Sequence, residues 1–187
     1  ITIKSNNNLI AYDICPVNIV FNHLSNLINL KYDDKGKISS SGKINLELFN
    51  HLQSIDYYKQ VSPKSLGVEW VKEVIIPIIN NFLEIPVEDL LNTFSKHFAF
   101  QIANNIKSSN KTLITGGGAY NDYLIQNIID LTESEIIIPS SEIIEYKEAL
   151  IFGFLGVLKD LNINNCYSSV TGAIKDHCSG NIFIPKI

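Results

Sequence analysis

The spacing of apolar residues predicts that the chain begins with short strands and amphipathic helices. Residues 1–3 and 9–14 are apolar runs joined by a polar, turn-forming segment, which predicts a β-hairpin. After Pro16, apolar residues recur at helical spacing and predict a helix, with Asn18 as its expected cap. Residues 32–42 are dense in Asp, Lys, Ser and Gly, which predicts a surface loop.

The middle of the chain predicts three helices. The first is short and places Leu46, Phe49 and Leu52 on one face. The second begins after the Ser-Pro-Lys-Ser break at 62–65 and should bend at Pro77. The third has Pro86 at its first turn and keeps an apolar stripe for about 20 residues.

From residue 112 the pattern changes to strand, turn and helix. Residues 113–115 form an apolar run that leads into Gly116, Gly117 and Gly118, and a helix follows over 121–131. A second unit has a strand over 135–138 and a helix over about 145–161. Alternating strands and helices predict one α/β domain with a parallel or mixed sheet flanked by helices.

Composition narrows the classes of function. The chain has 187 residues, the size of one domain or of one lobe of a larger protein. Its net charge is −4 and all 15 basic residues are Lys, so a general nucleic-acid binder is not expected. No apolar run approaches the roughly 18 residues of a membrane helix. Three widely spaced cysteines indicate free thiols in a reducing, cytoplasmic setting.

The start of the chain is an apolar, β-branched run without Met or a charged leader. We therefore expect a fragment whose preceding part is missing, rather than a signal or transit peptide.

The glycine turn is the strongest chemical signal. Three glycines at the carboxyl end of a strand, directly before a helix, let the backbone approach a ligand without a Cβ in the way. This predicts a nucleotide or anion contact at Gly116–Gly118, and a simple tight turn is the alternative. The turn is not a Walker A loop, because no Gly-Lys-Ser/Thr follows it.

Two acids are candidates for chemistry. Asp13 ends an apolar strand beside a predicted helix, where it can act as a general base or, alternatively, as a hydrogen-bonded turn acid. Glu148 begins the apolar helix and is either a ligand contact or an acid favoured by the first helical turn. No metal site is predicted, because Cys166, His177 and Cys178 lack the spacing of a zinc site.

Six short motifs, in their order along the chain, resemble the C-terminal half of the anhydro-N-acetylmuramic acid kinase family. They lie at residues 11–18, 32–36 with 41–43, 63–67, 115–121, 148–149 and 170–173. The resemblance implies an actin-like, hexokinase-type ATPase fold of two ribonuclease H-like lobes. Residues 1–187 would be the second lobe, and the N-terminal lobe would be absent.

The resemblance also implies an activity. ATP and Mg²⁺ would be the cofactors of a kinase that opens the 1,6-anhydro ring of its sugar with water and phosphorylates O6, in cytoplasmic peptidoglycan recycling. The partners would be the anhydro-sugar, the missing lobe and a second copy in a homodimer, with no nucleic acid and no membrane. The residues that match are Asp13 as general base, Gly116, Gly117, Gly118 and Asn121 toward the adenosine side of ATP, and Glu148 toward the sugar.

The chain departs from the family pattern in two ways. Cys15 and Val17 replace both glycines of the family's Asp-x-Gly-Pro-Gly-Asn motif, so side chains stand where backbone should approach a phosphate. The family's Gly-Thr-Ser-Leu-Asp-Gly phosphate loop is not in the chain, so the chain alone is expected to be inactive. A non-catalytic nucleotide-binding or scaffold paralogue, and a kinase for a related sugar, are the alternatives.

Overall fold

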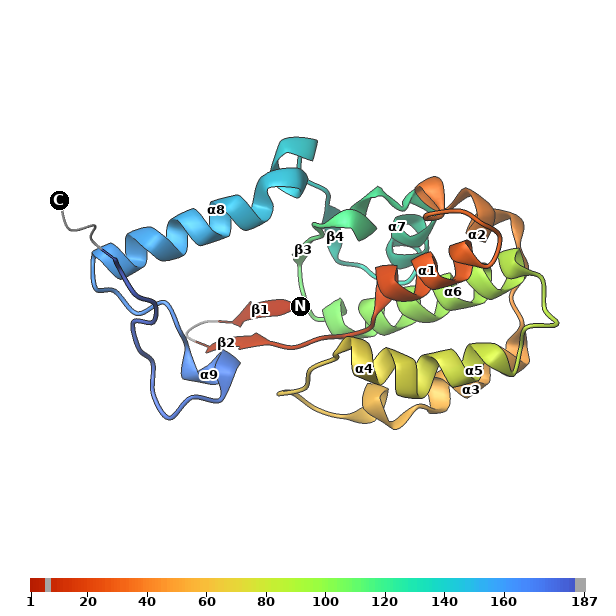
Figure 1. The fold of residues 1–187 in the computed structure, drawn as a ribbon, viewed down its shortest axis with the longest axis horizontal. Helices are drawn as coiled ribbons and strands as arrows, with labels where there is room; N and C mark the ends of the chain where they lie inside the picture. The colour runs from red at the N-terminus through yellow and green to blue at the C-terminus, as the bar shows by residue number, and fades with distance from the viewer. Residues whose placement is uncertain (6–7, 184–187) are drawn as a thin grey trace.

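A long buried helix, α6 (Val87–Ile106), lies at the centre of the fold in this computed structural model, which describes residues 1–5 and 8–183. Pro86 precedes its first residue, and Glu88 and Asp89 occupy its first turn, where acids are favoured. The predicted helix is confirmed. Figure 1 shows the shorter helices gathered around it, namely α1 (Val17–Asn26), α2 (Lys37–Ser41), α3 (Leu46–Ser54) and α7 (Asp122–Ile129).

The hydrophobic core is built on this helix. Phe94 and Phe98 of α6 are fully buried, and Phe21 of α1 meets Phe98 edge to face with ring centroids 5.5 Å apart. Leu48 and Leu52 of α3 are also fully buried, whereas Leu46 is 65% exposed, so the face predicted from Leu46, Phe49 and Leu52 is only partly correct. The core therefore lies in the helical body rather than between helices and a broad sheet.

The segment before α6 is helical but irregular. α4 (Val68–Trp70), a π-helical stretch η3 (Val71–Ile75) and α5 (Ile76–Asn80) follow one another without a break. Pro77 has no N–H to donate to the carbonyl four residues earlier, so the regular ladder cannot continue through it. A π-helical turn thus precedes the turn that contains Pro77, and the bend expected at this proline stays a prediction.

The strands form two separate pairs. β1 (Thr2–Ser5) and β2 (Asn8–Ala11) are antiparallel, with Ile3 opposite Ile10, which confirms the hairpin. Residues 6 and 7 of its predicted connection lie outside the described residues. β3 (Lys111–Leu113) and β4 (Glu135–Ile137) are parallel, as the repeated strand, turn and helix predict.

The prediction of one mixed sheet is wrong for the described residues. The hairpin and the parallel pair each have two strands, and no ladder joins them. The strands are three or four residues long, so each pair offers a short edge to any further strand. The structure is a mixed α/β arrangement of small sheets and many helices.

The segment predicted as a surface loop over 32–42 contains helical turns instead. η1 (Asp34–Gly36) leads into α2, and the two oxygens of the Asp33 carboxylate accept from the N–H groups of Ile38 and Ser39. The polar composition that suggested a loop supplies the hydrogen bonds that start a short helix. A second short turn of this kind, η2 (Asp56–Lys59), follows α3.

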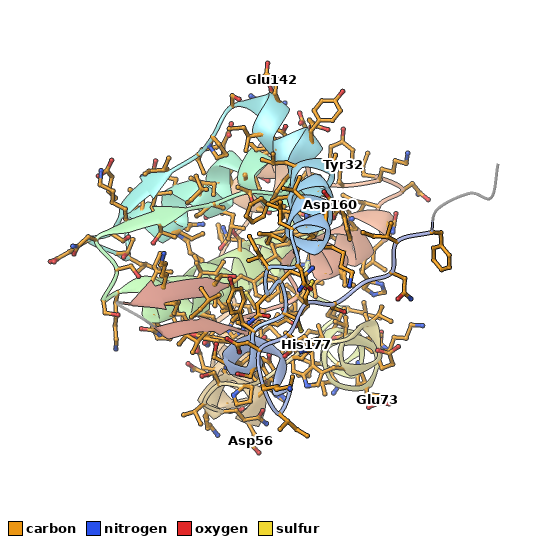
Figure 2. The ribbon with its side chains drawn as sticks, turned by 90° about the vertical axis from the view of Figure 1, so that its left-hand side faces the viewer. Tyr32, Asp56, Glu73, Glu142, Asp160 and His177 are labelled. Carbon is orange, nitrogen blue, oxygen red and sulfur yellow. The ribbon has the colours of Figure 1, made fainter. Side chains whose placement is uncertain are left out.

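Helix α8 (Ser141–Asp160) extends away from the body (Figure 1). Ile144 is its one buried residue, whereas Leu150, Phe152 and Phe154 are 60% exposed or more. Figure 2 looks toward this part of the molecule and shows α8 between Glu142 and Asp160 with its side chains projecting outward. The chain then returns to α9 (Ser168–Thr171), which lies beside β2.

Gly42 provides a stability prediction. A Cβ at this position would overlap the carbonyl group of Glu88 and lie 2.8 Å from the nitrogen of Asp89, so backbone would have to move. We expect Gly42→Ala to lower the free energy of unfolding by about 2 kcal/mol. Gly153→Ala is the matched control, because a Cβ there meets nothing within 4 Å and Ala favours the helix. Urea denaturation measures the free energy of unfolding of both variants. An equal change in the two variants would contradict the prediction that Gly42 is required by close backbone contact.

Candidate active site

Asp13 lies two residues after the end of strand β2, and its carboxylate is held in one orientation. Oδ2 accepts from the backbone N–H of Leu66 at 2.8 Å and from Oγ of Ser65 at 3.1 Å. No hydrogen bond to Oδ1 is found among the residues that the structure describes. The side chain is exposed, so one carboxylate oxygen is fixed and the other faces outward.

The backbone of Asp13 is anchored to the same neighbouring segment. Its N–H donates to the carbonyl of Lys64 at 3.2 Å, and its own carbonyl accepts from the Tyr57 hydroxyl at 2.6 Å. Burial raises the pKa of Tyr57 to about 12, so this phenol remains a donor at neutral pH. The position of Asp13 therefore depends on residues about 50 positions away in sequence.

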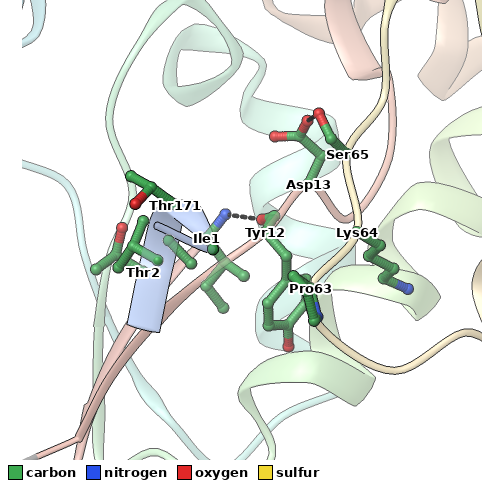
Figure 3. A pocket seen from close by; sticks show the side chains of 11 residues that line it. Ile1, Thr2, Tyr12, Asp13, Pro63, Lys64, Ser65 and Thr171 are labelled. Carbon is green, nitrogen blue, oxygen red and sulfur yellow. Dashed lines mark hydrogen bonds between the residues drawn. The ribbon is translucent and has the colours of Figure 1, made fainter. Parts of the chain in front are cut away.

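A cavity of about 580 Å³ opens beside Asp13 and collects three of the six motifs. Asp13 lines it from the first motif, Lys64 and Ser65 from the third, and Thr171 and Gly172 from the last. Figure 3 shows Ser65 against the Asp13 carboxylate, with Thr171 on another side of the cavity. Segments far apart in sequence thus meet at one place.

Lys64 is partly withdrawn from solvent at this site. Its Nζ donates to the Tyr57 carbonyl at 3.2 Å and lies 4.7 Å from the centroid of the Tyr57 ring. Burial lowers the pKa of Lys64. Ser65 and Lys64 belong to a motif noted in the sequence, but the residue pattern gave no role for either, because their contacts to Asp13 join segments about 50 residues apart.

The glycine turn lies in a different part of the molecule, between β3 and α7. Gly116 has φ +82°, a conformation that favours glycine, and η4 (Gly117–Tyr120) follows it. A Cβ on Gly117 would lie 3.0 Å from Nδ2 of Asn18, and one on Gly118 would lie 3.7 Å from Oδ1 of the same residue. The side-chain amide of Asn18 therefore rests against the turn.

This contact corrects the role predicted for Asn18. Pro16 is the residue before α1 and no side chain caps that helix. The amide of Asn18 instead joins the segment that carries Asp13 to the glycine turn. Two regions that the sequence placed in one site are thus connected through a single side chain.

The other two predicted residues have mixed outcomes. Asn121 is buried and its Oδ1 accepts from the N–H of Leu124, so its side chain caps α7 and its contact to a nucleotide stays a prediction. Glu148 is exposed on α8 and lines neither of the two described cavities. Because α8 begins at Ser141, Glu148 is not a first-turn acid, and the acid in that turn is Glu142.

Comparison with known proteins gives the family. A family model described as anhydro-N-acetylmuramic acid kinase matches residues 1–185. The chain belongs to the anhydro-N-acetylmuramic acid kinase family. An anhydro-N-acetylmuramic acid kinase of Clostridioides difficile (strain 630) is 34% identical over 187 aligned residues, which cover 92% of this chain and 48% of the relative.

Two further relatives carry the same name. The protein of Bacillus cereus (strain Q1) is 28% identical, with 98% of this chain and 52% of the relative covered. The protein of Gamma-proteobacterium EBAC31A08 is 30% identical, with 74% of this chain and 39% of the relative covered. The chain spans about half the length of the first two of these kinases.

The structure shows how Cys15 and Val17 are accommodated in the segment after Asp13. The N–H of Val17 donates to the Cys15 carbonyl at 3.1 Å, so this amide is already used inside the turn. Burial raises the pKa of the Cys15 thiol to about 12, which keeps it protonated at neutral pH. Cys15, Cys166 and Cys178 are all free thiols.

In residues 1–5 and 8–183, no three or more His, Cys, Asp or Glu side chains are grouped to hold a metal ion. None of the helices described there has the length and hydropathy needed to cross a bilayer.

Proposed function

We propose that the protein containing this chain is an ATP-dependent kinase of anhydro-N-acetylmuramic acid that acts in cytoplasmic peptidoglycan recycling. The observation that carries the proposal is the cavity beside Asp13, where three family motifs meet around an oriented carboxylate. Family membership and the names of the relatives support the substrate.

In this proposal Asp13 is the general base. Its free oxygen accepts a proton from water, whose oxygen bonds to C1 of the sugar while the bond from C1 to O6 breaks. O6 keeps the electron pair of the broken C1–O6 bond, and ATP, when bound, would supply the phosphoryl group that O6 receives, leaving ADP. Ser65 and Leu66 hold the carboxylate during this step, so that little reorientation is needed when the water is in place.

The glycine turn is assigned to the adenosine side of ATP, and Glu148 to the sugar. The fit of the turn is supported by its composition, since Gly116, Gly117 and Gly118 carry no side chains that would keep a ligand from the backbone. In the proposal Mg²⁺ binds together with ATP, because kinases hold this ion largely through the phosphate oxygens of the nucleotide. Asn121 belongs to the same nucleotide contact.

We further propose that residues 1–187 are one ribonuclease H-like lobe, corresponding to the C-terminal half of the relatives. The order of the six motifs supports this assignment. The apolar surface of α8 supports it too, because Leu150, Phe152 and Phe154 are exposed on different sides of the helix, and an apolar surface of this kind is typical of an interface. In the proposal part of this surface packs on the other lobe, and a homodimer forms from complete subunits.

A non-catalytic paralogue is the second candidate, and the Val17 amide favours it. That N–H is bonded to Cys15 instead of being free for a phosphate. The double variant Cys15→Gly/Val17→Gly restores the family's glycines and separates the two candidates.

The test mixes this chain with the remaining half of the Clostridioides difficile kinase and supplies ATP, Mg²⁺ and the anhydro-sugar. Phosphorylated sugar formed only by the mixture supports the kinase and the lobe. Turnover by the chain alone would refute the lobe assignment, and turnover only after the glycines are restored would favour the non-catalytic paralogue. No product from either form would contradict the kinase.

Nucleotide binding is tested on the chain by calorimetry. We expect Gly117→Val to weaken ATP binding on the order of ten-fold. The valine side chain would project from the turn backbone toward Asn18 and displace the Asn18 amide from the turn. Gly153→Val is the control, since a Cβ at Gly153 meets nothing within 4 Å and this residue lines neither described cavity. Equal binding by the wild type and Gly117→Val would remove the turn from the nucleotide site.

A further inference from the structure

Lys147 of α8 reaches the start of the glycine turn. Its Nζ donates to Oγ1 of Thr115 at 3.2 Å, and a Cβ on Gly116 would lie 3.8 Å from the same nitrogen. The side chain is half-buried. The Lys147 ammonium group, which comes from a helix distant in sequence, therefore lies beside Gly116, where the backbone carries no side chain.

The charge of Lys147 has no acidic partner among the described residues. The ion pairs found there involve other lysines, at 35, 37, 59 and 111. The nearest acid with a defined contact at this end of α8 is Glu145, whose carboxylate accepts from the Tyr120 hydroxyl at 2.7 Å. The Thr115 hydroxyl gives Lys147 a hydrogen-bond acceptor but does not neutralise its charge.

Further donors face the same turn. Nδ2 of Asn18 lies against Gly117, as described above. The N–H groups of Ala119 and Asn121 are used within the turn, but those of Gly117 and Gly118 donate to no described residue. An ammonium group, a side-chain amide and two free backbone N–H groups on one turn form a set of donors suited to phosphate oxygens.

We propose that Lys147 binds a phosphate group of the nucleotide at the glycine turn. The inference rests on the proposed function, and it adds to the adenosine contact a specific cation for the charged end of the ligand. The chain has no Arg, so a phosphate held by a side-chain cation here must be held by Lys, acting as a point charge. The ligand class is a nucleoside diphosphate or triphosphate.

The test compares ADP with adenosine, because the two differ in their phosphates. Dissociation constants are measured by calorimetry on the 187-residue chain at two salt concentrations, for the wild type and for Lys147→Gln. We expect Lys147→Gln to weaken ADP on the order of ten-fold and to leave adenosine unchanged, since one charge-assisted contact is lost. The salt dependence of ADP binding should also become shallower.

Lys159→Gln is the matched control, because Lys159 is a half-buried lysine near the other end of α8. It should change neither dissociation constant, and Lys147→Arg should retain ADP binding. Equal weakening of ADP and adenosine by Lys147→Gln would show a structural role, and an unchanged ADP constant would show no role; either result overturns the proposal and leaves the adenosine contact standing. A wild-type chain that binds neither ligand would overturn both the nucleotide site and this proposal.

Discussion

Asp13→Asn should lower kcat by about 10²–10⁴-fold in the assembled kinase, because an amide cannot take the proton of the attacking water. The amide oxygen can still accept from Ser65 and from the Leu66 N–H, so the local fold should persist. ATP binding should change little, since the glycine turn is built from other elements. Steady-state kinetics with the anhydro-sugar, together with calorimetry for ATP, measure the two effects. Unchanged turnover would remove Asp13 from the mechanism.

Ser65 gives a graded control for this prediction. Ser65→Ala removes one of the two hydrogen bonds to Oδ2 and leaves the bond from Leu66 in place. We expect kcat to fall roughly ten-fold with little change in KM, and Ser65→Thr to restore it, because one hydroxyl contact contributes about 1 kcal/mol. A fall in stability with unchanged kcat would instead assign Ser65 a purely structural role.

His97 should make the folded chain sensitive to acid. The side chain is fully buried in α6, and neither ring nitrogen has a hydrogen-bond partner among the described residues. Its ring lies 4.7 Å from that of Tyr58 and 5.6 Å from that of Phe98, measured between centroids. Burial lowers the pKa of His97 from 6.5 to about 3, because the charged ring would lose its hydration.

The sign of the pH effect follows from this shift. Between about pH 6.5 and pH 3 the unfolded chain binds a proton at His97 and the folded chain does not. The free energy of unfolding therefore falls as the pH drops through this window, by about 1.4 kcal/mol per pH unit from this residue. Between pH 7 and pH 4 the loss is about 3 kcal/mol.

Urea denaturation of His97→Phe and wild type at pH 7 and pH 4 isolates the effect. The difference in unfolding free energy between the two proteins should move in favour of the variant by about 3 kcal/mol at the lower pH. His97→Leu should show the same pH trend even if phenylalanine fits the site poorly, because the trend depends only on removing the imidazole. A pH-independent difference for both variants would contradict the shifted pKa of His97.

Much of the fold follows from local patterns in the sequence. The hairpin, α6 and the parallel pair β3–β4 were predicted from apolar spacing, from Pro86 and from the repeated strand, turn and helix. These elements have strong periodicity or a defined start. The segment 32–42 was misjudged because Asp33 uses its carboxylate to start a short helix, and polar composition alone does not distinguish this from a loop.

The site was only partly predictable. The residue pattern singled out Asp13 and the glycine turn and the resemblance to the family gave them roles, but the contacts of Ser65 and Lys147 depend on packing between distant segments. Lys147 reaches Thr115 across 32 positions of sequence, and no periodic pattern encodes such a contact. Asn18 was misread because its place before an apolar helical stripe is typical of a cap, whereas Pro16 precedes the helix and the amide lies on the turn.

The exposed apolar residues of α8 would couple the binding of a partner to the binding of nucleotide. The described contacts that tie α8 to the glycine turn come from its first half, through Glu145 and Lys147. A partner that covers the apolar remainder would restrict the helix and thereby the position of the Lys147 ammonium. Partner binding and nucleotide binding would then be linked. Because such linkage is reciprocal, bound nucleotide should raise the affinity for the partner by the same factor by which the bound partner raises the affinity for nucleotide.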